Sequence, residues 1–295
     1  MTNSNEATPT TPSGLLPATV GVLGGGRMGA GIAHAFLIRG SKVVVVERNE
    51  EAARGAQGRV AASVAASFDR GVVGGDSSEV LQRFETSVDY ADFALCDLVV
   101  EAVPEDEKLK ADALRAVSEH LSPNAYLATN TSSLSVSGLA ESLARPESFL
   151  GLHFFNPVPA STLIEVVVAE KTSEETLAAA RRWVSGLGKT AVIVRDAPGF
   201  ASSRLGVAIA LEAMRMVEEG VAAAEDIDNA MVLGYKHPVG PLRTTDIVGL
   251  DVRLGIAEYL HSTLGERFAP PQVLRDKVAA GELGRKTGRG FYEWS

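Results

Sequence analysis

The sequence predicts an α/β fold in which a mainly parallel sheet is followed by an all-helical C-terminal domain. Short β-rich runs alternate with helical patterns over residues 18–196, the order that builds a parallel sheet with helices on both faces. Beyond a Pro/Gly break at residues 196–199, apolar residues recur at helical spacing. A chain of 295 residues can bury two cores, since one domain takes roughly 100–200 residues.

The first domain, expected at 18–196, should contain strands in short runs rich in Val, Ile, Leu or aromatic residues. The predicted strands span 19–23, 42–46, 84–88, 95–103, 126–129, 149–155, 163–168 and 190–194. Helices are predicted at 30–40 with a Gly stop, at 50–70 before Gly74-Gly75, at 108–120 and at 173–186.

The second domain is expected at 197–295 and carries no nucleotide-binding pattern. Helical periodicity runs over 200–219, 225–233, 245–264 and 271–280, whereas 237–241 is expected to be non-helical and 290–292 extended. Residues 1–17 are rich in Thr, Ser, Asn and Pro and have neither a basic start nor an apolar core. They predict a disordered tail and not a signal peptide.

The first predicted strand runs into Gly24-Gly25-Gly26-Arg27-Met28-Gly29, which fits G-x-G-x-x-G between a strand and a helix. Such glycines permit a tight turn and close approach to a pyrophosphate, and the helix N-terminus supplies N–H donors to the phosphates. Glu47 ends the second strand, where it would bind a ribose and repel a 2′-phosphate. The pattern predicts a Rossmann-type domain that binds NAD, with Arg48 as the one residue that would favour NADP.

The amino-acid composition limits the kinds of molecule that this protein can bind. The net charge of −9 argues against nucleic acid or an anionic membrane surface, and no apolar run reaches the roughly 20 residues of a membrane span. Cys96 is the only cysteine, which excludes an intrachain disulfide and is typical of a reducing compartment. We therefore expect a cytoplasmic protein with no nucleic acid or membrane partner, and no cluster of residues in the sequence suggests a metal.

The helix predicted at 50–70 places Arg59, Ser63, Ser67 and Arg70 on one face. In an acidic protein, such a face would receive the anionic tail of a ligand. A solvated surface face fits the same spacing equally well.

The strongest indication of chemistry is a histidine at the end of an apolar run. His153 precedes Phe154-Phe155-Asn156-Pro157, and Glu165 lies on the next predicted strand. An imidazole changes charge near neutral pH, and a carboxylate would hold it in one tautomer. Glu105, Ser132 and His153 all follow or end predicted strands, where ligands bind in such sheets. A base beside a nicotinamide site predicts the oxidation of an alcohol.

On these residues the chain resembles the 3-hydroxyacyl-CoA dehydrogenase family, most nearly its stand-alone bacterial 3-hydroxybutyryl-CoA type. The resemblance covers residues 18–294 in the family's order. It rests on the segments 20–33, 100–105, 130–135, 151–159, 198–204, 226–228, 237–242, 249–251 and 284–292, together with Asp246. The His-Phe-Phe-Asn-Pro run at 153–157 and the His-Pro-Val-Gly-Pro-Leu run at 237–242 are far more specific than the glycine loop.

The resemblance implies reversible NAD-dependent oxidation of an (S)-3-hydroxyacyl-CoA to the 3-ketoacyl-CoA, in fatty acid metabolism and β-oxidation. It implies that His153 is the general base, that Glu165 pairs with it, that Ser132 donates to the substrate oxygen and that Asn156 shapes the site. The glycine loop and the resemblance together imply cofactor contacts from Gly24, Gly26, Arg27, Met28, Gly29, Glu47, Glu105, Lys110, Ser132 and Lys286. CoA contacts are implied for Ser63 and Arg70, and substrate contacts for Ser132 and Ser203. Apolar faces such as that of residues 205–217 predict a homodimer through the C-terminal domain.

Two residues depart from the family's pattern. Ser203 stands before Arg204 where the family usually has Asn, and its shorter reach would change the thioester contact. Thr162 stands where a Lys often precedes the strand that holds the glutamate. Neither position is the base or its partner.

Two other functions remain open from the sequence. One is the same hydride transfer on a sugar acid, as in L-gulonate-type relatives; Arg59 and Arg70 favour CoA instead. The other is a catalytically silent NAD-binding structural protein, as some crystallin relatives are. The presence of Ser132, His153 and Glu165 argues against it.

Overall fold

The computed structural model describes residues 14–294, which divide into two compact units, one ending at Asp196 and one beginning at Ala197. In the first unit, eight strands form one sheet in the order β3-β2-β1-β4-β5-β6-β7-β8. They are β1 (Thr19–Leu23), β2 (Lys42–Val46), β3 (Phe84–Ser87), β4 (Leu98–Glu101), β5 (Tyr126–Thr129), β6 (Phe149–Phe154), β7 (Leu163–Val168) and β8 (Thr190–Arg195). All neighbours pair in parallel except β6 and β7, which are antiparallel.

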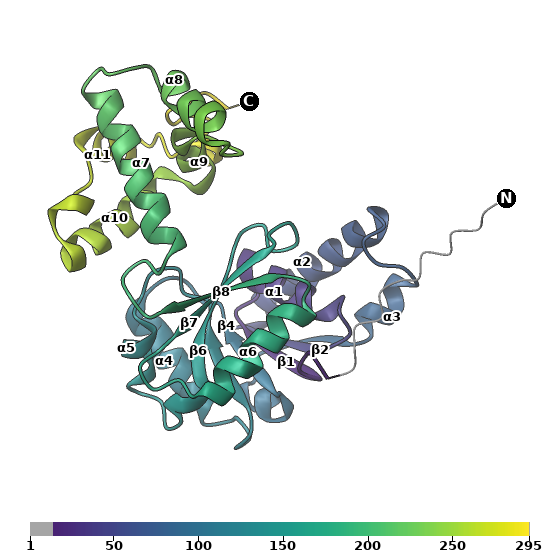
Figure 1. Ribbon diagram of the computed structural model, residues 1–295. Coiled ribbons are helices and arrows are strands. Elements are labelled where there is room, and N and C mark those ends of the chain that lie inside the picture. The colour runs from purple at the N-terminus through teal and green to yellow at the C-terminus, as the bar shows by residue number, and fades with distance from the viewer. Residues whose placement is uncertain (1–13, 295) are drawn as a thin grey trace. The chain divides into compact units, whose positions relative to one another are not determined.

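Helices cover both faces of this sheet, which explains why its central strands are almost wholly apolar. One core joins the sheet to α1 (Arg27–Leu37), α2 (Glu50–Asp69) and α6 (Glu174–Gly186). The helices α4 (Glu107–Ser118) and α5 (Val136–Ala140) contact each other, and Figure 1 shows them on the other side of the sheet from α1 and α2.

The parallel register brings the carboxyl ends of β1, β4, β5 and β6 to one edge of the sheet. The loops that follow these strands therefore converge there, which is the place where open α/β sheets bind ligands. The turn from β6 to β7 reverses the chain, and the register of this antiparallel pair sets His153 opposite Glu165.

Several boundaries in the first unit differ from the prediction. The strand predicted at 95–103 is shorter, because a 3-10 helix capped by Asp89 occupies Tyr90–Leu95 and β4 begins only at Leu98. The short helices α3 (Ser77–Leu81) and α5 have too few residues to show a helical period. The side chain of Leu16 packs against the core and Ser41 Oγ donates to Pro17 O at 2.8 Å, so the folded part begins before Ala18. Residues 1–13 of the predicted tail lie outside the described residues.

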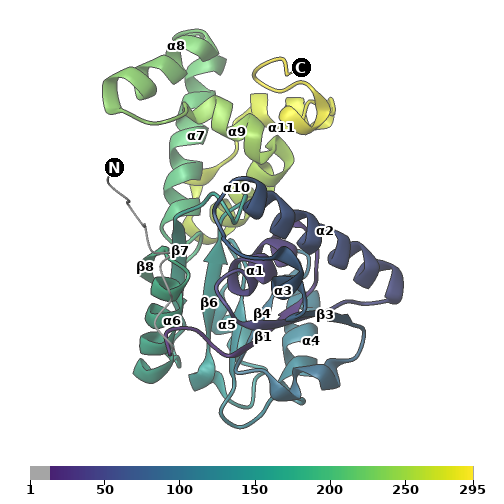
Figure 2. The same ribbon diagram turned by 90° about the vertical axis from the view of Figure 1, so that its right-hand side faces the viewer.

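The second unit consists of helices. They are α7 (Ser202–Glu218), α8 (Ala224–Asn229), a π-helical turn (Ala230–Gly234), α9 (Pro241–Val248), α10 (Leu250–Leu264) and α11 (Gln272–Ala279). α7 packs on α9, α10 and α11 around a separate apolar core (Figures 1 and 2). The predicted class, a mainly parallel Rossmann-type sheet followed by an all-helical domain, is confirmed. No helix within residues 14–294 is long and apolar enough to span a membrane.

Three expectations for the second unit are wrong. The single helix predicted at 245–264 is two helices, because Gly249 adopts φ +109° between α9 and α10. Pro241, which the prediction excluded from helix, occupies the first turn of α9, where a missing N–H leaves no hydrogen bond unmade. Residues 290–292 contribute no strand; only isolated bridges pair Arg289 with Gly284 and with Glu293.

Candidate active site

The glycine loop after β1 is as tight as its sequence suggests. Gly24 adopts φ +90°, which strongly favours glycine. A Cβ at Gly29 would lie 1.7 Å from Gly24 O, so only glycine allows α1 to start this close to β1. The N-terminus of α1 consequently faces the converging loops with its N–H groups, which makes it a site for phosphate.

Glu47, at the end of β2, is tied to this loop. Its Oε1 accepts a hydrogen bond from Gly25 N at 2.7 Å. Arg59 Nε, from α2, donates to Gly25 O at 2.8 Å. The peptide of Gly25 is thereby held from both sides, with an acid and a base in contact with the loop.

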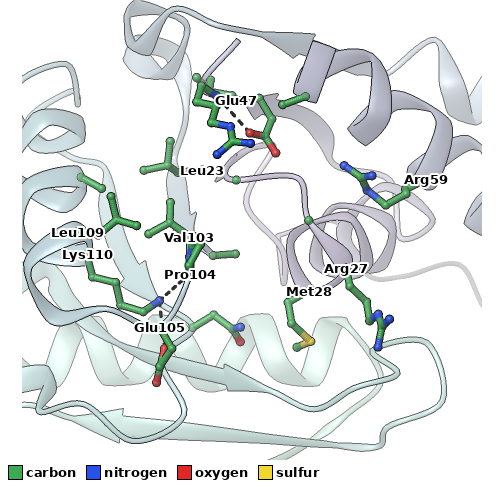
Figure 3. Close-up of a pocket in the computed structure, with 18 of the residues that line it drawn as sticks. Leu23, Arg27, Met28, Glu47, Arg59, Val103, Pro104, Glu105, Leu109 and Lys110 are labelled. Carbon is green, nitrogen blue, oxygen red and sulfur yellow. Dashed lines mark hydrogen bonds and ion pairs between the residues drawn. The ribbon is translucent and has the colours of Figure 1, made fainter. Parts of the chain in front are cut away.

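A cleft of about 800 Å³ opens between the glycine loop and the loops after β4 and β5. Figure 3 shows Glu47 at one end of it and Lys110 with Glu105 at the other. Among the residues predicted to contact the cofactor, its lining includes Gly24, Gly26, Arg27, Met28, Glu47, Glu105, Lys110 and Ser132. Gly29 lies beneath the loop, and Arg48 and Arg59 also line the cleft.

Lys110 is 1% exposed and Glu101, at the end of β4, is fully buried, although no residue pattern indicates this burial. Lysine is rarely buried without a partner. Lys110 Nζ lies 2.8 Å from Glu101 Oε1 and 3.1 Å from Val103 O. Glu101 also accepts from Val103 N at 2.7 Å and from Thr129 Oγ1 at 2.6 Å. This network fixes the loop after β4 to the start of α4 and to the end of β5.

Glu105 links that network to Ser132. Its Oε2 lies 3.4 Å from Lys110 Nζ, and its Oε1 accepts from Thr131 Oγ1 at 2.6 Å and Ser132 N at 2.8 Å. Burial raises the pKa of Glu105, but Lys110 and these hydrogen bonds outweigh burial and hold the pKa below its usual value. An ionised carboxylate therefore positions the backbone of Ser132 after β5.

His153 and Glu165 form a buried pair across β6 and β7. His153 Nδ1 lies 2.8 Å from Glu165 Oε2, and the ring centroids of His153 and Phe155 are 4.3 Å apart. With Nδ1 donating to the carboxylate, a neutral imidazole carries its lone pair on Nε2. Asn130 Oδ1 accepts from Phe154 N at 2.8 Å and so ties the end of β5 to the end of β6. The arrangement can take up a proton and stabilise the resulting charge.

The basic face predicted on α2 is divided between two pockets, and Ser67 and Arg70 line the same one. Ser67 is buried, and its Oγ lies 2.8 Å from His34 Nε2, because α2 packs this residue against α1. Arg59 lines the large cleft, whereas Arg70 lines a separate pocket of about 260 Å³ together with Arg39 and Lys189. Ser63 is half-buried between them along α2.

The other predicted site residues, Asn156, Ser203 and Lys286, are not among those that line the 800 Å³ cleft. Asn156 is exposed in the segment after β6. Ser203 belongs to the first turn of α7 in the second unit. Lys286, in the same unit, has its Nζ 2.6 Å from both carboxylate oxygens of Asp251.

Two buried carboxylates explain most of the motif residues of the second unit. Asp228 accepts from Leu242 N at 2.8 Å and so caps α9. Asp246 accepts from Phe291 N and Tyr292 N, both at 2.9 Å. A Cβ at Gly240 would lie 2.2 Å from the side chain of Asp228, and a Cβ at Gly290 would lie 2.3 Å from that of Asp246. These residues stabilise the second unit, and this structural role explains why they form a recognisable pattern in the sequence.

Family models match nearly all of the described chain. The model of the 3-hydroxyacyl-CoA dehydrogenase NAD-binding domain matches residues 19–197. The model of the 3-hydroxyacyl-CoA dehydrogenase C-terminal domain matches residues 199–294.

Individual relatives agree with the family models. A probable 3-hydroxybutyryl-CoA dehydrogenase of Deinococcus radiodurans is 41% identical, over 93% of this chain and 99% of its own. A mitochondrial hydroxyacyl-coenzyme A dehydrogenase of Sus scrofa is 37% identical, over 95% of this chain and 92% of its own. The crystal structure of an (S)-3-hydroxybutyryl-CoA dehydrogenase from Ralstonia eutropha, 38% identical, superposes with a TM-score of 0.90 over 95% of this chain and 99% of that one.

The resemblance seen in the sequence is thereby confirmed, and the residues present suit the cofactor that the family uses. The glycine loop, the acid at the end of β2 and the 800 Å³ cleft are those of a dinucleotide site. The chain therefore belongs to the 3-hydroxyacyl-CoA dehydrogenase family and is an NAD-dependent oxidoreductase.

Proposed function

We propose that this enzyme interconverts a short-chain (S)-3-hydroxyacyl-CoA, with (S)-3-hydroxybutyryl-CoA as the reference substrate, and the corresponding 3-ketoacyl-CoA. The observation that carries the proposal is the buried pair of His153 and Glu165 beside the end of the strand that leads to Ser132. Relatives named 3-hydroxybutyryl-CoA dehydrogenases, whose matches cover 93–95% of this chain, support the substrate class.

The first unit would hold NAD, which when bound supplies the hydride acceptor. The N–H groups at the start of α1 would receive the pyrophosphate, and Glu47 would accept hydrogen bonds from the adenosine ribose. Lys110 and Glu105 would fix the nicotinamide half of the cleft, because they line its far end. We further propose that Lys286 of the second unit contributes to cofactor binding.

His153 would act as the general base. Its Nε2 would take the proton of the 3-hydroxyl group while Glu165, bound to Nδ1, stabilises the imidazolium that forms. The hydroxyl of Ser132 would donate to the same substrate oxygen, and Asn156 would shape the site. In the reverse direction the imidazolium would return the proton.

The pocket that Arg70 lines supports CoA as the carrier. Three cations, Arg39, Arg70 and Lys189, meet there, and no ion pair with a carboxylate joins any of them within residues 14–294. Phosphate groups are the natural counter-ions for such a cluster. We propose that Ser63 and Arg70 bind the CoA moiety and that Ser203 contacts the thioester end.

Initial rates should show which cofactor and which class of substrate the enzyme prefers. With acetoacetyl-CoA, we expect kcat/KM to be at least roughly tenfold higher with NADH than with NADPH, because Glu47 would lie against a 2′-phosphate. L-gulonate with NAD should give no turnover above background. Equal rates with NADPH would identify Arg48 as a phosphate partner. Turnover of L-gulonate but not of acyl-CoA would transfer the enzyme to the sugar-acid class, and no turnover at all would favour a structural protein.

We also propose a homodimer that forms through the second unit. Leu233 and Tyr235 are 68% and 76% exposed there, and an apolar groove over α7, α8 and the π-helical turn is lined by Ile209, Met216 and Met231. Exposed apolar surface of this kind marks an interface.

Light scattering should give twice the 31.0 kDa chain mass for the wild type and the single mass after the double substitution Leu233→Glu, Tyr235→Glu. Leu95→Glu is the matched control, since Leu95 is 85% exposed on the first unit. A wild-type monomer, or dissociation caused only by Leu95→Glu, would contradict the proposal.

We place the enzyme in the cytoplasm and in fatty acid β-oxidation. Cys96, the only cysteine in the sequence, is buried, and burial raises its pKa to about 12. Such a thiol is unreactive, as suits a reducing compartment.

A further inference from the structure

The end of the 800 Å³ cleft where Glu47 lies also contains two arginines that the binding of NAD does not require. Arg48 and Arg59 both line the cleft there. A ribose with free 2′- and 3′-hydroxyls is neutral, so an NAD site needs an acceptor such as Glu47 at this place and no cation. The two guanidinium groups therefore need another explanation.

Arg59 reaches the glycine loop because α2 packs directly on it. A Cβ at Gly25 would lie 2.3 Å from Ala56 Cβ, so this contact leaves no space for a side chain. Arg59 follows Ala56 by three residues and lies on the same side of α2. Its Nε donates to Gly25 O at 2.8 Å, and Figure 3 shows the guanidinium directed from α2 toward the loop. This bond fixes the side chain, while Nη1 and Nη2 make no hydrogen bond within residues 14–294.

Glu47 and Arg59 hold the same peptide from its two ends. Gly25 N donates to Glu47 Oε1 at 2.7 Å, and Gly25 O accepts from Arg59. Backbone bonds keep the N and O of one residue within about 4 Å, so Arg59 Nε lies no more than about 10 Å from the carboxylate. Arg48 directly follows Glu47, and its backbone N donates to Glu47 Oε2 at 3.2 Å. The carboxylate thus lies close to both arginines.

The charges at this end of the cleft are poorly balanced. Within residues 14–294, neither Arg48 nor Arg59 forms an ion pair with a carboxylate. The other acid that lines the cleft, Glu105, lies at the far end with Lys110. Glu47 is therefore the one acid that opposes two cations at its end of the described cleft.

We propose that Arg48 and Arg59 form a latent site for the 2′-phosphate of NADP and that Glu47 alone keeps the enzyme specific for NAD. Guanidinium groups are the preferred protein partners of a phosphate, whereas a carboxylate repels it. Neutralising Glu47 would remove the repulsion and leave both cations in place. This inference rests on the adenosine ribose lying at Glu47, as proposed above, and names the residues that decide between the two cofactors.

Two nucleotides that differ only by a 2′-phosphate test the proposal. Calorimetric titration should show that the wild type binds 5′-ADP more tightly than 2′,5′-ADP. In Glu47→Gln, which keeps an oxygen for Gly25 N and removes the charge, we expect the ratio of the two dissociation constants to shift by roughly 10- to 100-fold in favour of 2′,5′-ADP. Initial rates with acetoacetyl-CoA should show the same shift from NADH toward NADPH.

Second substitutions in the Glu47→Gln background identify the phosphate partners. Adding Arg59→Met or Arg48→Met should each return the ratio by roughly tenfold toward the wild-type value. Loss of the bond from Arg59 to the glycine loop would disturb both nucleotides alike and would cancel in the ratio. Adding Arg54→Met is the matched control, since Arg54 is exposed on the same helix but does not line the cleft, and it should leave the ratio unchanged.

The outcomes separate the arginines from the placement of the ribose. If neither arginine substitution changes the ratio, or if both nucleotides lose affinity equally, the latent phosphate site is overturned and only the ribose placement stands. An unchanged ratio in Glu47→Gln itself would overturn the ribose placement together with this inference. Because the titration needs no acyl-CoA, its result holds whether or not the enzyme turns over the proposed substrate.

Discussion

His153→Gln is expected to lower kcat by roughly 10²–10⁴ while leaving the fold and the affinity for NAD unchanged. Glutamine fills a similar volume and can still meet Glu165, but its amide cannot take a proton from the substrate. Steady-state rates with saturating acetoacetyl-CoA and NADH measure the loss, and fluorescence titration with NADH measures the affinity. Retention of more than about a tenth of wild-type kcat would show that another residue is the base.

Glu165→Gln provides the matched comparison. A neutral amide would still bind Nδ1 but would not balance the charge of the imidazolium, so kcat should fall here too. In the double variant the two losses should not add, because both residues act through the same imidazole. Additive losses would mean that Glu165 serves a step in which His153 has no part.

Lys110→Met is expected to destabilise the first unit by roughly 3–5 kcal/mol of unfolding free energy. Methionine fills the space, but it leaves the fully buried carboxylate of Glu101 without its cation. We expect a fall in Tm of the order of 10 °C, measured by calorimetry. Weakened NAD binding should accompany it, since the network also positions Glu105.

Lys108→Met is the control for this substitution. Lys108 lies two residues earlier on α4 and pairs with Asp112 at 2.7 Å, but its side chain is 86% exposed. Exposed pairs of this kind contribute little to stability, so the Tm should not change measurably. Equal shifts in the two variants would show that the buried network has no special role.

Much of this fold could be predicted from residue patterns. The Val-rich runs at β1, β2 and β7 identify buried strands, and Gly24 to Gly29 with Glu47 identifies a dinucleotide site, because backbone geometry there demands particular residues. His153 is conspicuous in the sequence because it is a polar residue at the end of an apolar run.

Other features left no local trace in the sequence. The break at Gly249 lies inside a continuous helical pattern and depends on a positive φ that many glycines do not adopt. Glu101 reads as an ordinary acid at the end of a strand; only the fold brings Lys110 to it. The spacing of Ser67 along α2 predicts a ligand-facing position and gives no sign of His34 on the neighbouring helix, against which Ser67 is buried.

The one antiparallel pairing in the sheet has a wider consequence. His153 and Glu165 face each other across hydrogen-bonded backbones, so their separation is inherited from the strand ladder and not from any loop. The proposed acid–base couple is thus rigid before any ligand arrives, and little reorganisation is needed at the moment of proton transfer.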